Sequence, residues 1–283
     1  MSIQFSPVVT AQEQPGGGTF SVKAIDVRQF GGSASAVTVL DDFRVSGHPF
    51  PPHPHAGFSA VTYVFEDSPG ALRSRDSLGN DVVTSPGGIV WTQAGSGVIH
   101  EEIPADLNRE LHGLQVFVNL SSKNKLLAPR MFRLEKSEVQ EWRSGTGDRV
   151  RVLVGAFEGV ASPLVPAEPF TFLDVELRRE VSLDLKNQEN AIIYVVKGSV
   201  LVRADAREQK VTDEQAVALY GGKGRVTFDC SAPAHFLLLC GGEIREPIVM
   251  EGPFMMNERS QIEDAAARYR SGRMGHLPPL SKS

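Results

Sequence analysis

Cysteine is scarce in this chain of 283 residues, which contains only Cys230 and Cys240. Two cysteines are too few for a disulfide scaffold, and these two are too isolated to form a zinc ribbon. We therefore expect both to be buried thiols in or near strands.

Long apolar runs and an excess of basic residues are also missing. No segment approaches the length of a membrane span, and the opening residues MSIQFSPVVTAQEQPGGG lack the basic segment and apolar core of a secretory signal. The net charge of −5 and the pI near 5.8 give no general attraction for phosphate backbones or anionic lipids. We expect a monomeric cytoplasmic protein that binds neither nucleic acid nor membranes directly.

Aromatic residues make up only 7% of the chain, whereas 27 glycines and 18 prolines occur. This balance favours many short strands joined by turns over long helices. With 41% hydrophobic residues, the chain can form one large or two medium domains. The predicted fold class is all-β.

Strand-like segments form two series. In the first, from Phe20 to Leu120, short apolar runs alternate with turn sequences such as SLGND and SPGG. The polar stretch EKSEVQEWRSGTGDR, residues 135–149, is predicted to be a linker, and a second series then runs from VRVLVGAF to AHFLLLC. Two β-barrels or sandwiches are expected.

The two series show weak internal similarity, which predicts a duplicated barrel. VTYVFEDSPGAL compares with IIYVVKGSVLV, and GSGVIHEE compares with GKGRVTFD. This alignment places His53, His55, His100 and Glu102 on Asp184, Lys186, Thr227 and Asp229. Because the second copy has no imidazole at these positions, chemistry is expected in the first half only, and the second half is expected to be structural or to shape the entrance.

The C-terminal residues predict a helix. Ser260 and Glu263 fit a capping box, and Gly272 fits a stop signal. The expected apolar face consists of Ile262, Ala265, Ala266 and Tyr269. Three arginines suit the negative end of the helix dipole and are expected to be solvated, namely Arg268, Arg270 and Arg273.

A close pair of histidines lies in HPHAGF, where His53 and His55 flank a proline. Side chains at i and i+2 of a strand share a face, and the proline keeps the preceding residue out of the helical region. His100 and Glu102 repeat this spacing in GVIHEE, whereas Glu101 between them is expected to point the opposite way. Two such pairs on facing strands would enclose one cation.

Three imidazoles and a carboxylate, without a thiolate, suit Fe(II) and also Mn, Ni, Cu or Zn. Four protein ligands leave two octahedral positions open, as a catalytic metal requires. Each pair alone is more often a surface or hydrogen-bonded pair than a metal site. The two pairs together, in strand-like segments that turns can fold onto each other, favour a metal site.

Other residues offer weaker candidates. His112 lies in an apolar strand and is interpreted as structural, with a contact to a metal ligand as the alternative. Trp91 and Phe58 are interpreted as barrel core, with an apolar pocket near the metal as the alternative. The histidines without partners at ligand spacing are His48, His235 and His276.

Several motifs in order resemble the signature segments of the pirin family, within the cupin superfamily. They are HPHAGFSAVTYVFE, RDSLGN, SPGGIVWTQAGSGVIHEE, LHGLQVFVNL and the ending EPIVMEGPFMMNERSQIEDAAARYRSGRMG. The resemblance covers nearly the whole chain. It implies two tandem cupin (jelly-roll) β-barrels with a C-terminal helix. We predict a metal-binding barrel at residues 1–135, a barrel without ligands at 148–248 and a helical tail at 249–283.

The resemblance also implies a single non-haem iron in the first barrel, with His53, His55, His100 and Glu102 as ligands. It implies flavonol 2,3-dioxygenase activity with quercetin-like substrates and O2, in which Glu102 is both a ligand and a possible base. The alternative is a redox-dependent transcriptional co-regulator that acts through a protein partner. A purely structural metal is the third possibility.

Two positions depart from the family pattern. Many members have glutamate where this chain has Ser59, and histidine where it has Ser74. Neither change removes a ligand of the pattern. Both are expected to alter the pocket and the substrate more than metal binding.

Overall fold

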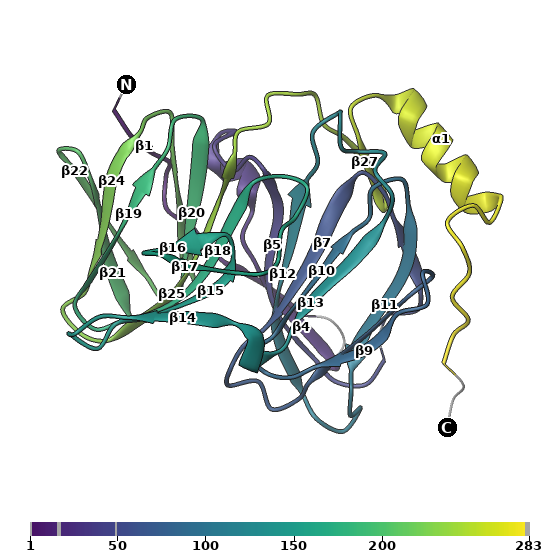
Figure 1. Cartoon of the computed structure of the whole chain (residues 1–283), viewed down its shortest axis with the longest axis horizontal. Helices are drawn as coiled ribbons and strands as arrows, with labels where there is room; N and C mark the ends of the chain where they lie inside the picture. The colour runs from purple at the N-terminus through teal and green to yellow at the C-terminus, as the bar shows by residue number, and fades with distance from the viewer. Residues whose placement is uncertain (1, 16–17, 49, 281–283) are drawn as a thin grey trace. The chain divides into compact units, whose positions relative to one another are not determined.

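The structure is a computed structural model that describes residues 2–15, 18–48 and 50–280 (Figure 1). Within these residues the strands of each sheet pair antiparallel, and one α-helix occurs, α1 (Arg259–Arg270). The all-β prediction is confirmed. No helix in the described ranges is long and apolar enough to cross a membrane.

The chain divides into two compact units, each built from separate stretches. The first barrel comprises residues 14–22, 41–136 and 244–283, and the second barrel comprises 1–13, 23–40 and 137–243. These units differ from the contiguous ranges predicted, because the C-terminal tail joins the first barrel and two N-terminal stretches join the second.

The first barrel contains two sheets and a short hairpin. One sheet has the order β13-β10-β7-β12-β5-β4-β3, and the other has the order β6-β11-β8-β9. The division between the units runs through β3, β4 and β5. The strands are β3 (Gln12–Pro15), β4 (Phe20–Ala24), β5 (Val37–Val45), β6 (His53–His55), β7 (Phe58–Val64), β8 (Leu72–Asp76), β9 (Asp81–Thr84), β10 (Ile89–Gln93), β11 (Val98–Pro104), β12 (Leu111–Asn119), β13 (Arg130–Leu134), β26 (Val249–Glu251) and β27 (Phe254–Met256).

The second barrel also has two main sheets and a small hairpin, β16-β17. Its larger sheet has the order β1-β23-β20-β25-β18-β15-β14, with β2 also paired to β23, and the smaller has the order β19-β24-β21-β22. The strands are β1 (Gln4–Phe5), β2 (Val9–Thr10), β14 (Gln140–Arg143), β15 (Arg149–Val154), β16 (Ala156–Phe157), β17 (Val160–Ala161), β18 (Phe170–Leu177), β19 (Glu180–Leu185), β20 (Glu189–Lys197), β21 (Ser199–Ala204), β22 (Arg207–Thr212), β23 (Gln215–Tyr220), β24 (Gly224–Asp229) and β25 (Ala234–Gly242). Two short 3-10 helices complete the secondary structure, η1 (Val27–Phe30) and η2 (Lys136–Glu138).

The strand order is duplicated, as the internal similarity predicts. The run β10-β7-β12-β5-β4 of the first barrel corresponds to β23-β20-β25-β18-β15 of the second, and β6-β11-β8-β9 corresponds to β19-β24-β21-β22.

The residue-by-residue alignment of the two copies was wrong. Asp184 is exposed and Asp229 pairs with Arg203 at 2.9 Å, whereas the neighbouring Val226 and Phe228 are buried in the core of the second barrel. A shift of one residue moves every side chain of a strand to the other face. The inward positions of β19 and β24 therefore carry hydrocarbon.

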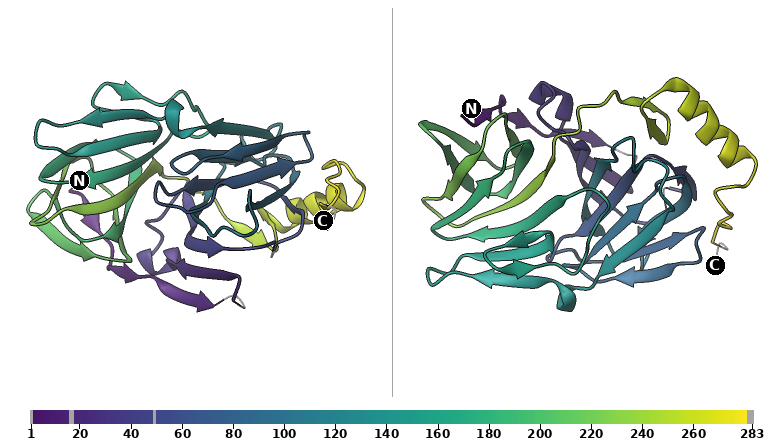
Figure 2. Two further views of the ribbon diagram at one scale, coloured as in Figure 1. Left: turned by 90° about the horizontal axis from the view of Figure 1, so that it is seen from below. Right: turned by 45° about the horizontal axis from the view of Figure 1, so that its top comes forward.

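The predicted linker at 135–149 contains the boundary between the units, after Lys136, but most of it belongs to the second barrel, since β14 pairs with β15 from Gln140↔Val152 to Arg143↔Arg149. The N-terminal strands β1 and β2, drawn in purple in Figure 2, pair with β23. They cover the edge of a sheet in the second barrel, which would otherwise expose unpaired backbone groups. Polar composition in one case and distance along the chain in the other concealed these pairings.

The helix α1 begins two residues earlier than the predicted capping box implies. Its N-cap is Glu258, whose backbone N–H donates to the Gln261 side chain at 3.1 Å, so the capping box of Ser260 and Glu263 does not form. Gly272, at φ +73°, follows the helix end as predicted.

The packing of α1 confirms part of the predicted apolar face. Ile262 and Ala265 are buried and Ala266 packs beside them, but Tyr269 is 41% exposed. Arg268, predicted to be solvated, is half-buried and donates to the Ser96 carbonyl at 3.0 Å, while Arg270 and Arg273 are exposed. The cysteine prediction holds for Cys240, which is buried in β25, and Cys230 is half-buried just after β24.

Candidate metal site

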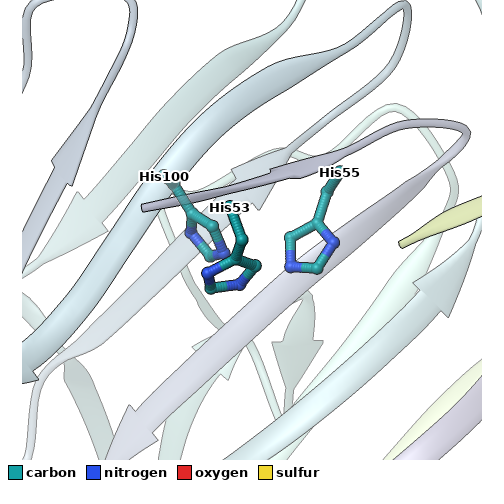
Figure 3. A group of neighbouring side chains, drawn as sticks. All are labelled: His53, His55 and His100. Atoms are coloured by element: carbon teal, nitrogen blue, oxygen red, sulfur yellow. The ribbon is translucent and has the colours of Figure 1, made fainter. Parts of the chain in front are cut away.

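Two adjacent strands of the first barrel bring three histidines together (Figure 3). β6 pairs with β11 so that His53 lies directly opposite His100, and His55 lies two residues further along β6 on the same face. Their nearest ring nitrogens all lie within 4.8 Å of one another. Three imidazoles predicted from spacing alone therefore form one cluster that could hold a metal ion.

Backbone carbonyls orient two of the rings. His53 Nδ1 lies 3.0 Å from the Pro51 carbonyl, and His55 Nδ1 lies 3.4 Å from the Pro253 carbonyl. A carbonyl oxygen only accepts, so each Nδ1 carries the proton and each Nε2 keeps its lone pair. This tautomer and this outer contact are typical of metal-ligating histidines.

Burial keeps the inner rings neutral. Burial, together with the charge of His53, lowers the pKa of His55 to about 3. Burial also lowers the pKa of His100, with His55 and His53 as additional causes. His100 Nδ1 is buried without a hydrogen-bond partner in the described part of the chain. Two buried neutral imidazoles, one of them with an unsatisfied nitrogen, fit a bound cation.

Glu102, the fourth predicted ligand, lies near this group but outside it. On β11 it faces Ser74 of β8, whose hydroxyl donates to Oε1 at 3.5 Å, and Thr62 Oγ1 donates to Oε2 at 2.5 Å. Burial raises the pKa of Glu102 to about 7, while both hydroxyl hydrogen bonds lower it. The carboxyl is thus held by two hydroxyls and is a proton acceptor near neutral pH.

The three histidines and Glu102 line one cavity of about 210 Å³. One wall comes from the four-stranded sheet and carries His53, His55, Leu72, His100 and Glu102. The other comes from the seven-stranded sheet and carries Phe20, Val22, Asp41, Phe43, Val45, Leu111, Gln115 and Phe117. Phe50 from the loop before β6 completes the lining. The cavity is therefore mostly apolar, with a few polar groups on its walls.

The sequence did not single out most of this lining. Asp41, Phe43 and Val45 alternate along β5, so the period-two pattern of AVTVLDDFRV was the available signal. Trp91 and Phe58 are buried and are not among the lining residues, in agreement with their interpretation as core.

A C-terminal strap, which consists of residues 253–278, contacts the histidine cluster at His55 and Ala56. Phe254 forms a bridge to Ala56 beside His55, and the backbone N–H of Met255 donates to the Ala56 carbonyl at 3.0 Å. A Cβ on Gly57, whose φ is +85°, would lie 1.9 Å from the Met255 carbonyl oxygen, so only glycine fits there. Figure 2 shows this yellow segment beside the blue strands of the first barrel.

A buried lysine ties the strap to the segment that follows the histidine strand β6. Lys125 is 2% exposed, and its Nζ donates to the Gly57 carbonyl at 3.0 Å, the Met255 carbonyl at 3.1 Å and Asn119 Oδ1 at 2.6 Å. One ammonium thus satisfies acceptors from three separate segments next to the metal cluster.

Glu101 points away from the cluster, as predicted. Its buried carboxylate accepts from Arg75 at 2.7 Å and lies 2.8 Å from His48 Nε2. Arg75 also donates to the Pro278 carbonyl of the strap at 3.1 Å. His48 is therefore part of an ion-pair network on the other face of β11.

The remaining histidines lie outside the cluster. His112 Nε2 lies 2.9 Å from Asp42 Oδ1 on the outer side of β5, which supports its structural interpretation. His235 in the second barrel lies 2.5 Å from Asp174 Oδ1, and His276 is exposed.

Two barrels of this strand order, with a histidine cluster in one of them, define a bicupin protein. The sequence model of the family described as Pirin matches residues 11–118, and the model of the Pirin C-terminal cupin domain matches residues 172–275. The chain belongs to the pirin family.

Two relatives illustrate the range of this family. A Pseudomonas aeruginosa protein, whose name assigns it quercetin 2,3-dioxygenase activity provisionally, is 36% identical over 82% of this chain and 81% of its own length. Pirin of Rattus norvegicus is 32% identical over 84% of this chain and 81% of its own length.

Solved structures share the fold. A quercetin 2,3-dioxygenase from Acinetobacter baumannii has a TM-score of 0.84 at 22% identity, covering 98% of this chain and 100% of that one. The bacterial pirin YhhW from Escherichia coli, in complex with nickel(II), has a TM-score of 0.67 at 18% identity, covering 85% of this chain and 100% of that one.

Proposed function

We propose that this protein is an iron(II)-dependent oxygenase that acts on flavonols, with His53, His55, His100 and Glu102 as the metal ligands. One observation carries the proposal: three imidazoles converge in the wall of a mostly apolar cavity that also contains a partly buried carboxyl group. Neutral imidazole and carboxylate oxygen are ligands that suit Fe(II).

The chain's own groups match the needs of such a reaction. Phe43, Leu111 and Phe117 offer apolar surface for a planar aromatic ring and exclude water from it. Glu102, held by Thr62 and Ser74, accepts the proton of a substrate hydroxyl at its Oε atoms. A bound first-row metal would supply Lewis acidity toward that hydroxyl oxygen and a place for O2.

The relatives support the same class of reaction and leave room for other metals. The Pseudomonas relative is named for quercetin 2,3-dioxygenase activity, and the Escherichia coli pirin holds nickel(II). Mn, Ni, Cu and Zn are accordingly tested beside iron.

The test starts from metal-free protein loaded separately with each metal. We expect one metal ion per chain and aerobic loss of the flavonol absorbance of quercetin, fastest with Fe(II). The absence of turnover with every first-row metal, at full occupancy, would contradict the proposal.

A second candidate function is a metal-dependent regulator that binds a protein partner. The contact of His55 with the Pro253 carbonyl favours it, because this contact links the cluster to the strap that leads into α1. Pull-downs with metal-free and iron-loaded protein should recover different partners. Identical recovery in both states would count against a metal-dependent switch.

A further inference from the structure

The strand β5 places two adjacent aspartates on opposite faces. Asp41 lines the cavity together with Phe43 and Val45, whereas Asp42 points outward to His112. The two residues share one strand and differ only in the face on which they lie. They therefore provide an internal comparison between a cavity carboxyl and a structural one.

Apart from the histidines of the metal cluster, the other polar side chains of the cavity wall already have partners. Glu102 accepts from Thr62 and Ser74, and the Gln115 side chain, whose Oε1 lies 3.2 Å from Thr62 Oγ1, donates to the Val61 carbonyl at 3.0 Å. Asp41 makes no hydrogen bond or ion pair with any residue in the described ranges. Its carboxyl oxygens are thus unused acceptors in a mostly apolar cavity.

An unpaired carboxylate in such a cavity destabilises the folded protein. A partly buried carboxylate without donors loses hydration and gains nothing from the protein, and burial raises the pKa of Asp41 to about 6. Buried polar groups normally have partners, and exceptions in a cleft point to a ligand. A hydroxyl of a bound molecule would provide the missing donor.

The two carboxyl groups come from facing walls of the cavity. Glu102 lies on the four-stranded sheet beside the histidines, and Asp41 lies on the seven-stranded sheet. A planar ligand that presents one hydroxyl to the histidines and Glu102 therefore meets Asp41 with a different part of its edge.

We propose that Asp41 is a specificity-determining residue, which accepts a hydrogen bond from a second hydroxyl of a polyhydroxylated aromatic ligand. This inference rests on the proposed function, because it takes the first hydroxyl to be the one at the metal cluster. It narrows the substrate class to aromatic compounds that carry a further hydroxyl besides the metal-binding one. A charge-assisted hydrogen bond of this kind discriminates strongly against ligands that lack the donor.

The experiment measures binding to zinc-loaded protein, because zinc is redox-inert and keeps the ligand intact. The probes are 3-hydroxyflavone, galangin, kaempferol and quercetin, which share the 3-hydroxyl and 4-keto group and carry increasing numbers of other hydroxyls. For the unmodified protein we expect a step of about tenfold in Kd between two neighbouring members, as one hydrogen bond to a charged group provides. A step at galangin assigns the hydroxyl that Asp41 binds to the 5,7-pair, a step at kaempferol to the 4′-hydroxyl, and a step at quercetin to the 3′-hydroxyl.

Two variants test the assignment. Asp41→Leu should remove the step, so that all four Kd values agree within about twofold, while the affinity for 3-hydroxyflavone is kept. Asp41→Asn, which preserves shape and one acceptor, should leave a reduced step. Asp42→Asn on the outer face is the matched control and should leave the step intact.

The outcomes separate this inference from the function on which it rests. Equal Kd values for all four probes in the unmodified protein, or an undiminished step in Asp41→Leu, would overturn the role of Asp41. Aerobic turnover of 3-hydroxyflavone by the iron-loaded protein reports on the proposed function independently, since that probe has no second hydroxyl. Absence of both binding and turnover for every probe would overturn both.

Discussion

The two barrels share a strand order and differ in what fills their interiors. In the first, β6 and β11 direct His53, His55 and His100 into a cavity. In the second, the corresponding strands β19 and β24 direct hydrocarbon side chains inward. The jelly-roll fold therefore accepts either interior, and the chemistry depends on a few inward positions of two adjacent strands.

The interior of the second barrel is a packed core. Val181, Leu185, Val226 and Phe228 are each at most 4% exposed and belong to one large apolar cluster. The polar residues of the same strands, such as Asp184 and Asp229, face outward. The second copy thus lacks both the ligands and the space for a metal, which fits a structural role.

The largest expected effect is the loss of bound metal from the first barrel. His55→Ala removes a ligand nitrogen and the contact to the Pro253 carbonyl, so bound iron should fall to less than about a tenth of one equivalent. Metal content of the purified, iron-loaded protein by elemental analysis provides the measurement.

His235→Ala in the second barrel is the control for that substitution. His235 contacts Asp174 and lies on β25, outside the cluster, so its variant should retain iron. Equal iron content in the two variants would show that the ligand assignment is wrong. A thermal melt of each metal-free variant separates ligand loss from unfolding.

A smaller effect is expected on the free energy of unfolding when one phenylalanine is truncated in each barrel. Phe228→Ala in the filled barrel should lower the free energy of unfolding by about 3–5 kcal/mol, as is typical for a buried phenylalanine. Phe43→Ala in the cavity wall should lower it by only about 1–2 kcal/mol, because one side of that ring already lacks packed neighbours. Denaturant unfolding of both variants measures the difference. Similar losses would mean that the first barrel is packed as tightly as the second.

Local sequence patterns predicted the histidine cluster well. His53, His55 and His100 follow from i, i+2 spacing in strands, which depends only on backbone geometry. The all-β class followed equally from short apolar runs between turn residues. Each of these two patterns extends over only a few consecutive residues of the chain.

Contacts between distant residues were beyond such patterns. The pairing of β1 with β23 joins residues about 200 positions apart, and the edge that β1 covers cannot be seen in either sequence segment. The hydrogen-bond partners of Glu102 are also distant in the sequence. Thr62 lies on the facing sheet, and Ser74 was noted only as a departure from the family pattern. Asp41 and Asp42 are adjacent in the sequence, and the structure assigns them to different faces of β5.

The last effect concerns the strap, which supports the histidine strand β6 of the first barrel. Lys125→Met keeps the length of the side chain but leaves the carbonyls of Gly57 and Met255 and the amide oxygen of Asn119 without their shared donor. Because a buried acceptor left unsatisfied costs about 1–3 kcal/mol and these three can relax together, we expect a loss of about 2 kcal/mol in unfolding free energy. Trypsin should also release the C-terminal segment faster.

Lys123→Met is the control, since Lys123 is exposed and lies two residues away in the same loop. It should change neither the unfolding free energy nor the cleavage rate measurably. If Lys125→Met lowered stability without faster cleavage of the strap, the lysine would stabilise the loop around Asn119 rather than the docking of the strap. If both effects appear, the first barrel depends on a C-terminal segment to hold its histidine strand β6 in place, a requirement that the filled core of the second barrel does not share.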